Sequence, residues 1–140
     1  MKSLVELAIV IPAYNEEQRL PKTLSVIAEY FSRRRRFCEL IIVDDGSRDN
    51  TEKIAREFKF PAGRLRVLVN RRNRGKGASI RRGIAAARAE LVLFTDADLS
   101  TPIGELETME NALRLARMLS LLRARSKAAG LLPGNRYTGN

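Results

Sequence analysis

Apolar residues along the chain follow two different periods. Four short runs are apolar at nearly every position, which is typical of strands buried in a sheet, and four longer stretches place apolar residues three or four positions apart, which indicates helices. The expected strands span 4–12, 40–43, 65–69 and 91–95, and the expected helices span 21–31, 51–58, 75–88 and 102 to about 125. Strands that alternate with helices predict an α/β fold with a parallel sheet and right-handed crossovers.

Polar sequences follow three of the expected strands. They lie at 12–16, 44–47 and 96–98. Carboxyl ends of parallel strands meet at one edge of a sheet, where open α/β sheets bind ligands, so we expect the three sequences to lie together. Tyr14 offers a flat ring for a base, Asp44 can accept a hydrogen bond from a base N–H, and Glu16 can accept one from ribose hydroxyls. Gly46 permits close backbone approach. Each sequence alone also fits a turn or a helix cap, but their coincidence favours a ligand site.

Two carboxylates, Asp96 and Asp98, stand one residue apart directly after the apolar run 91–94. The two carboxylates of such a pair repel each other and are costly to desolvate unless a cation lies between them. Mg²⁺ or Mn²⁺ suits oxygen ligands of this kind, keeps several waters and commonly bridges to a phosphate. The pair therefore predicts a metal-bound phosphate ester or diphosphate. The alternative is that both residues only begin the next helix.

The sequence Asn-Arg-Gly-Lys-Gly at 73–77 precedes the third expected helix. It is not a Walker A loop, because Gly77 follows the lysine where that motif requires Ser or Thr. It is not a dinucleotide fingerprint either, because Ile80 stands where the third glycine belongs. It still places Lys76 at a helix N-terminus, where anions are favoured. The alternative is a tight turn with a solvated lysine.

The formal net charge of +10 indicates an anionic partner, which is a nucleic acid, a phosphorylated ligand or an anionic lipid surface. Basic residues gather at 33–36, where a solvated loop is the commoner explanation, and in 111–140, which contains no acidic residue. The few aromatic residues are not interleaved with these basic runs, and no nucleic-acid-binding motif is recognisable. We therefore expect no nucleic-acid partner.

Residue types that are scarce also limit the chemistry. The chain contains no His, which excludes histidine-dependent catalysis and histidine metal sites. Its single Cys38 excludes an internal disulfide and suits a reducing cytoplasm. No apolar run approaches the roughly 20 residues that span a bilayer, and the N-terminus lacks the apolar region of a signal peptide. We therefore expect a cytoplasmic protein.

Four of these motifs occur together in the order and spacing of a known family. They are the sequences at 11–17, 43–51, 74–78 and 94–102. On these motifs the chain resembles the family 2 glycosyltransferases, and within them the dolichyl- or polyprenyl-phosphate glucosyltransferases, for which Asp-Ala-Asp-Leu-Ser-Thr-Pro is typical. The resemblance implies a Rossmann-like parallel sheet with flanking helices, the nucleotide-diphospho-sugar transferase fold, incomplete at its C-terminal side.

The resemblance also implies an inverting transferase that moves a sugar, glucose from UDP-glucose, to dolichyl or polyprenyl phosphate with the help of Mg²⁺ or Mn²⁺. The nucleotide-binding residues that it implies are Pro12, Tyr14, Glu16, Asp44, Asp45 and Lys76, and the catalytic and metal-binding residues are Asp96 and Asp98. A polyprenyl-phosphate mannosyltransferase that uses GDP-mannose shares the earlier motifs and remains an alternative.

The resemblance extends from residue 4 to about residue 110, and the acceptor-side sequences of the family have no counterpart. We therefore expect residues 1–113 to be the nucleotide-sugar-binding half of a catalytic domain, and 114–140 to be a basic helix and tail, frayed from 130 onward. A truncated or frame-shifted product, a fragment or a short paralogue would each explain this. A non-catalytic nucleotide-sugar-binding fragment is the corresponding alternative function.

The last expected helix places Leu113, Ala116, Leu119 and Leu122 at helical spacing, with basic residues mostly to the other side. Packing on the sheet is the interpretation for 102 to about 113. Peripheral contact with an anionic membrane at its cytoplasmic face is the interpretation for the rest, because basic amphipathic helices bind such surfaces.

Overall fold

The computed structural model describes residues 5–130. Its elements, in chain order, are β1 (Leu7–Ala13), α1 (Leu20–Arg33), β2 (Cys38–Asp44), α2 (Thr51–Glu57), β3 (Gly63–Val69), α3 (Lys76–Ala86), β4 (Leu91–Phe94) and α4 (Glu105–Ala128). The chain divides into two compact units, one ending at Ile103 and one beginning at Gly104. All strands belong to the first unit, and α4 is the helix of the second.

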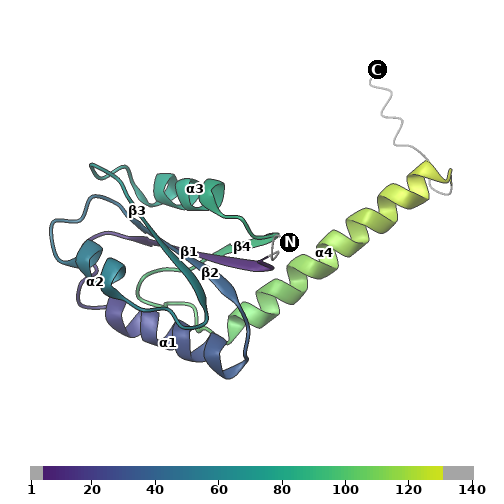
Figure 1. The fold of residues 1–140 in the computed structure, drawn as a ribbon. Helices are drawn as coiled ribbons and strands as arrows, with labels where there is room; N and C mark the ends of the chain where they lie inside the picture. The colour runs from purple at the N-terminus through teal and green to yellow at the C-terminus, as the bar shows by residue number, and fades with distance from the viewer. Residues whose placement is uncertain (1–4, 131–140) are drawn as a thin grey trace, which may run out of the picture. The chain divides into compact units, whose positions relative to one another are not determined.

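The first unit is built on a parallel sheet with the strand order β3-β2-β1-β4. Helices α1 and α2 lie on one side of the sheet and α3 lies on the other (Figure 1). The chain builds outward from β1 to β3 and then crosses back to place β4 on the free side of β1. The strand order therefore reverses between β1 and β4, and such a switch point is where open α/β sheets form a ligand crevice at the carboxyl ends of their strands.

The expected alternation of strands and helices is confirmed, with shifts of a few residues at the element ends. Every residue of β1 and β2 is buried, as expected for central strands of a parallel sheet covered on both faces. Strand β2 begins at Cys38, two residues before the expected apolar run. The apolar run missed this part of the strand because it contains Glu39, a charged residue that is nevertheless buried. Glu39 accepts hydrogen bonds from Arg66 Nη1 at 3.0 Å and from the Arg88 N–H at 2.9 Å.

Helix α3 packs closely on the sheet because it presents Gly83 to strand β1. A Cβ atom added at Gly83 would stand 2.3 Å from Val10 Cγ1, so there is no room for a side chain between α3 and β1 at this position. By contrast, a Cβ added at Gly77 in the same helix would meet nothing nearer than the Arg81 side chain at 3.5 Å.

We expect Gly83→Ala to lower the free energy of unfolding by about 1–3 kcal/mol, because overpacking forces the helix away from Val10. Gly77→Ala is the matched control and should instead stabilise by up to about 1 kcal/mol, since alanine favours helix. Urea denaturation of both variants measures the two changes. Equal effects would contradict the close packing of α3 on β1.

In the second unit, α4 carries Glu105 and Glu107 in its first turn and Arg125 and Lys127 in its last, a distribution that favours the helix dipole. Leu113, Leu119 and Leu122 are exposed, and so are Leu115, Met118 and Leu121. At 100° per residue Leu115 falls within the stripe of the first three, but Met118 and Leu121 fall outside it. The apolar residues therefore surround the helix more widely than expected. Among the residues described, no helix has the length and apolar character needed to cross a bilayer. The expected frayed tail lies almost wholly at 131–140, outside the described residues.

Candidate functional site

A pocket of about 420 Å³ opens at the carboxyl edge of the sheet, where the strand order reverses. Its lining comes from the segments that follow all four strands, which confirms that the polar strand ends share one edge. The lining residues are Pro12, Ala13, Tyr14, Glu16, Asp45, Asn73, Gly75, Lys76, Ser79, Asp96, Ala97 and Asp98. The space suits a ligand larger than a single phosphate.

The two carboxylates after β4 both face cations of this chain. The Lys76 ammonium pairs with Asp96, and Arg19 Nη1 lies 3.7 Å from Asp98 Oδ2. The hydrogen bond from Lys76, with a second from Ser100 Oγ, holds the pKa of Asp96 below its ordinary value. Asp98 accepts the Ser100 N–H at 3.0 Å. Both carboxylates are more than a third exposed, so the lysine and arginine can be exchanged for another cation without opening the core.

A divalent cation fits this donor set only as a partly protein-bound ion. Within residues 5–130, no group of three or more acidic, His or Cys side chains is assembled for a metal. Asp96 and Asp98 would therefore supply two oxygen ligands, and water and phosphate oxygens would supply the rest. That division suits Mg²⁺ or Mn²⁺, which keep waters and bind substrate phosphates, and does not suit an all-protein metal cage.

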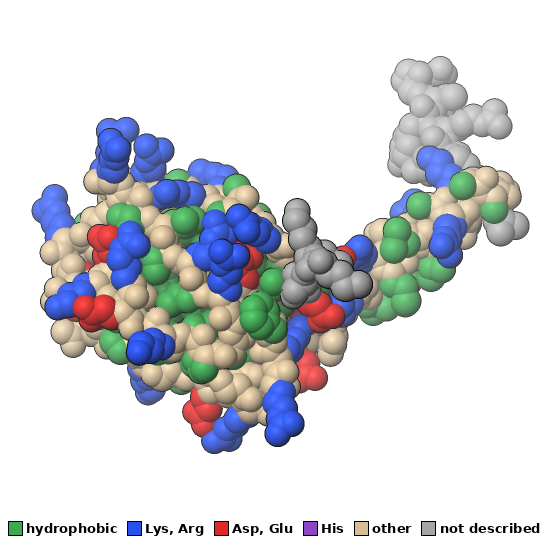
Figure 2. Space-filling view, in the orientation of Figure 1, with side chains coloured by type: hydrophobic (Ala, Val, Ile, Leu, Met, Phe, Trp, Pro, Cys, Tyr) green, Lys and Arg blue, Asp and Glu red, His purple; other side chains and the backbone are tan. Residues whose placement is uncertain are grey.

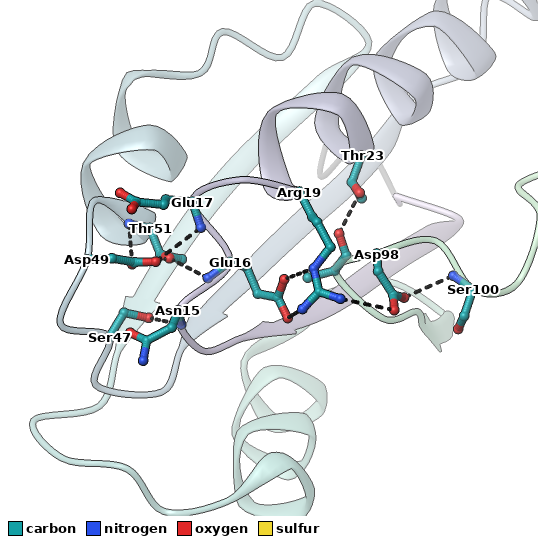
Figure 3. Close-up of polar contacts among 11 residues, drawn as sticks. Asn15, Glu16, Glu17, Arg19, Thr23, Ser47, Asp49, Thr51, Asp98 and Ser100 are labelled. Carbon is teal, nitrogen blue, oxygen red and sulfur yellow. Dashed lines mark hydrogen bonds and ion pairs between the residues drawn. The ribbon is translucent and has the colours of Figure 1, made fainter.

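Arg19 connects two of the expected site residues, and the sequence reasoning did not identify it. Its guanidinium donates to both carboxylate oxygens of Glu16, at 2.7 and 2.9 Å, and reaches Asp98 from the same position. Figure 3 shows Arg19 between Glu16 and Asp98. The only signal in the sequence is the three-residue spacing from Glu16, which is common for surface ion pairs on helices.

Asp45 anchors the loop between β3 and α3 beneath the pocket. Its carboxylate, in a residue only 3% exposed, accepts the side-chain amide of Asn70 at 2.8 Å and the backbone N–H groups of Arg74 and Gly75, each at 2.9 Å. Burial alone would raise the pKa of Asp45, but these hydrogen bonds together outweigh it and hold the pKa below its ordinary value. Asp45 therefore fixes the glycine-rich segment and borders the pocket at the same time.

Gly46 does allow a close backbone approach, as expected, but the approaching backbone belongs to this chain. A Cβ at Gly46 would stand 2.8 Å from Arg72 C and 2.9 Å from Asn73 N, and its φ of 73° lies in the left-handed region. The turn after β2 thus lies directly against the loop before α3, and Asp45 and Gly46 together hold that loop.

Asp44 lies at the end of β2 beside this turn and is almost wholly buried. It is not among the residues that line the pocket. The hydroxyl and the N–H of Ser47 both donate to its Oδ1. Burial raises the pKa of the Asp44 carboxyl, and the hydrogen bonds from Ser47 offset only part of that rise. Its contact with a base stays a prediction.

Side chains of the β2–α2 loop also hold the β1–α1 loop in place. The N–H groups of three consecutive residues each meet an oxygen across the gap (Figure 3): Asn15 N to Ser47 Oγ at 2.9 Å, Glu16 N to Thr51 Oγ1 at 2.8 Å, and Glu17 N to Asp49 Oδ2 at 3.2 Å. These contacts fix the backbone that presents Tyr14 and Glu16.

Helix α1 also ties the β4 segment to the site. The hydroxyl of Thr23 donates to the carbonyl oxygen of Ala97 at 2.5 Å, between the two expected metal ligands (Figure 3). The pocket thus brings together seven of the eight expected site residues, all but Asp44. Arg19 and Thr23 join its surroundings, as do Asn73 and Ser79, without having been expected.

Comparison with known proteins identifies the family. Residues 8–118 match the model of "Glycosyl transferase family 2". The chain is 39% identical over 115 residues to the dolichyl-phosphate beta-glucosyltransferase of Mus musculus, a match that covers 77% of this chain and 36% of that protein. It is 37% identical over 116 residues to the enzyme of the same name from Saccharomyces cerevisiae, covering 76% and 34% of the two chains. The chain thus spans about a third of these relatives.

Solved structures agree with this assignment. The mannosyltransferase PcManGT of Pyrobaculum calidifontis, in complex with GDP-Man and Mn²⁺, superposes with a TM-score of 0.58 at 25% identity, covering 69% of this chain and 28% of that one. S. aureus TarS in complex with UDP superposes with a TM-score of 0.56 at 25% identity, covering 66% and 27%. Family model, curated relatives and structures thus agree: the chain belongs to glycosyl transferase family 2.

Proposed function

We propose that this chain holds the nucleotide-sugar donor of an inverting glycosyltransferase that passes glucose from UDP-glucose to dolichyl or polyprenyl phosphate. The observation that supports the proposal is the carboxylate pair Asp96 and Asp98, which lines the same pocket as Tyr14 and Glu16. The names of the curated relatives support the sugar and the lipid acceptor.

The proposed roles follow from the chemistry of each side chain. Asp96 and Asp98 would hold the divalent ion, which, when bound, supplies Lewis-acid stabilisation of the charge that builds on the departing nucleoside diphosphate. Lys76, at the N-terminus of α3, would turn from Asp96 toward a phosphate oxygen, because its side chain is more than half exposed. Pro12, Tyr14 and Glu16 would border the nucleoside, and Asp45 would keep the glycine-rich segment in place.

The acceptor needs little help from a general base under this proposal. A lipid phosphate is already an anionic nucleophile, in contrast to a sugar hydroxyl. The chain contains no His, so no residue with an unperturbed pKa near neutrality is available for that task. We assign residues 1–113 to donor binding and assign no acceptor contact to 114–140.

Two assays separate this function from the non-catalytic alternative. In the first, UDP-glucose is titrated into the chain with Mn²⁺. In the second, the chain is incubated with radiolabelled UDP-glucose and dolichyl phosphate in detergent, and label is measured in the organic phase. Label that enters the lipid supports the transferase. Binding without any transfer would favour a donor-binding module, which is the alternative consistent with a match to only about a third of the relatives.

We expect Asp44→Ala to lower nucleotide affinity by about tenfold while the chain stays folded. Because burial raises the pKa of Asp44, its ionised form is disfavoured in the folded state and is not a source of stability at neutral pH. Circular dichroism and calorimetry with UDP and Mn²⁺ measure the two effects. An unfolded variant would show that Asp44 serves the fold, and unchanged affinity would remove its role in base recognition.

We further propose that the basic segment 114–140 makes peripheral contact with an anionic membrane. Its described part combines exposed Leu119 and Leu122 with Arg117, Arg123 and Arg125. Such side chains favour an anionic lipid surface. Co-sedimentation with anionic vesicles should therefore fall with added salt and with deletion of 114–140, whereas a chain that stays in the supernatant at low salt would contradict the contact.

A further inference from the structure

A second cavity lies where the β3–α3 loop meets α3. It measures about 330 Å³ and is lined by Val69, Asn70, Arg71, Arg74 and Arg82. None of these five residues lines the pocket of Asp96 and Asp98. Three of the five are arginines, which makes the lining strongly cationic, and Figure 2 shows Lys and Arg side chains over the face that α3 covers.

The arginines of this cavity are not neutralised by the chain. Within residues 5–130, Arg19, Arg56 and Arg66 each lie within 4.0 Å of a carboxylate, but no ion pair of that kind includes Arg71, Arg74 or Arg82. Three like charges around one small space repel each other and gain from a shared anion. A guanidinium is also the side chain whose donor geometry matches a phosphate.

Hydrogen bonds to neighbouring residues fix the position of one of the three arginines, Arg82. Arg82 Nη1 donates to the carbonyl oxygen of Val69 at 2.7 Å and to Asn70 Oδ1 at 2.6 Å. Asn70 is in turn fixed, because its amide donates to Asp45 Oδ1 at 2.8 Å and to Ser79 Oγ at 3.1 Å. Arg82 uses one nitrogen for these bonds, so its other donors stay available at little further cost in side-chain entropy.

We propose that this arginine pocket, formed by Arg71, Arg74 and Arg82, is a second anion site that takes a phosphate group, carried by a small soluble molecule or by a lipid. The site requires neither Asp96, Asp98 nor a metal, so it does not depend on the proposed function. Its occupant would also restrain the loop that Asp45 anchors, because Arg74 contributes its side chain to this cavity and its N–H to Asp45.

The first test uses inorganic phosphate and pyrophosphate as probes. Each is titrated by calorimetry into the full chain at low salt with EDTA present, so that a metal cannot carry the binding. We expect saturable binding that Arg71→Gln/Arg74→Gln weakens by about tenfold or more. Neither side chain makes a hydrogen bond or ion pair in the described structure that the fold would lose, and Arg82→Gln provides an independent variant.

Two matched controls give the result its meaning. Arg64→Gln removes an exposed arginine from the opposite end of β3 and should change affinity by less than about twofold, as general charge screening predicts. Lys53→Gln removes an exposed cation from α2, which lies on the other side of the sheet from α3 (Figure 1), and should leave phosphate binding intact. If Arg64→Gln weakens binding as much as the double variant, the effect is one of net charge and the proposal is wrong.

The second test separates the two sources of the phosphate. Vesicles of phosphatidylcholine with phosphatidic acid carry a phosphate monoester on a lipid. If the chain binds the free probes and the double variant does not, the ligand is a soluble molecule. If the chain binds only the vesicles and the double variant does not, the ligand is a lipid phosphate. Absence of binding to both probes and vesicles, or binding that the double variant and Arg82→Gln leave unchanged, would overturn the proposal.

Discussion

Replacing Asp98 with alanine is expected to weaken Mn²⁺-dependent UDP binding by roughly 100-fold, as loss of a metal-supporting carboxylate commonly does. Asp96 and Asp98 are the two carboxylates that we assign to the ion at this pocket, so removing one leaves a single assigned protein ligand. The fold should be unaffected, since the contact of Asp98 with Arg19 is 3.7 Å long and exposed. Calorimetry with UDP, with and without Mn²⁺, measures the loss.

The matched control is Glu57→Ala, which removes an exposed carboxylate at the end of α2 outside the pocket and should leave UDP binding unchanged. The Asp98 variant should also lose most of the difference between Mn²⁺ and EDTA that the unchanged chain shows. Equal UDP affinity of the variant and the unchanged chain would remove the metal hypothesis.

Replacing Asp45 with alanine is expected to cost about 3 kcal/mol of unfolding free energy. The change would remove the acceptor of the buried Asn70 amide and of the part-buried N–H groups of Arg74 and Gly75. Asp45→Asn is the matched control: it keeps one acceptor oxygen, so it should lose less. Urea denaturation at neutral pH measures both.

The pH dependence gives this prediction a second readout. Hydrogen bonds hold the pKa of Asp45 below its ordinary value of 3.8, so its contribution to stability is fully present above that value and is lost as pH falls through the lower folded-state pKa. The difference in stability between the unchanged chain and Asp45→Ala should thus be constant from pH 7 to about pH 5 and should shrink in acid below 3.8. A difference that grows as the pH falls would contradict the assignment.

The sheet could be predicted from the sequence because its signal is local. The apolar runs at 40–43 and 91–95 leave few alternatives to buried parallel strands, and the polar residues after them had to share an edge. The start of β2 could not be predicted in the same way. By its type, Glu39 is expected outside a buried strand. Hydrogen bonds from Arg66 and from the Arg88 N–H, both distant in sequence, stabilise its buried carboxylate.

The site was predictable in its residue types and less so in its contacts. Asp45 and Gly46 stood out as polar and flexible residues after a strand, but the sequence gives no sign that both hold the loop at 72–75. The contact of Arg19 with Asp98 joins segments far apart in the chain, so no spacing rule finds it. The contact of Thr23 with Ala97 could not be predicted for the same reason, since the two residues are far apart in the sequence.

The exposed leucines of α4 mark a different limit of sequence patterns. Leu113, Leu119 and Leu122 fit one side of a helix, and this favoured an amphipathic interpretation. Met118 and Leu121 are exposed elsewhere around the same helix, so the pattern does not define a single apolar face. The periodicity predicted the helix correctly, but it did not predict how the exposed apolar residues are distributed around it.

Our central proposal is that residues 1–113 hold a metal-dependent site for a nucleotide sugar. The most direct test is calorimetric titration of UDP-glucose and of GDP-mannose into the unchanged chain, each in Mn²⁺ and in EDTA. The account predicts saturable binding of UDP-glucose in Mn²⁺, weaker binding of GDP-mannose, and loss of both in EDTA. Binding of UDP-glucose that is equal in Mn²⁺ and EDTA, or no binding of either sugar nucleotide, would contradict it.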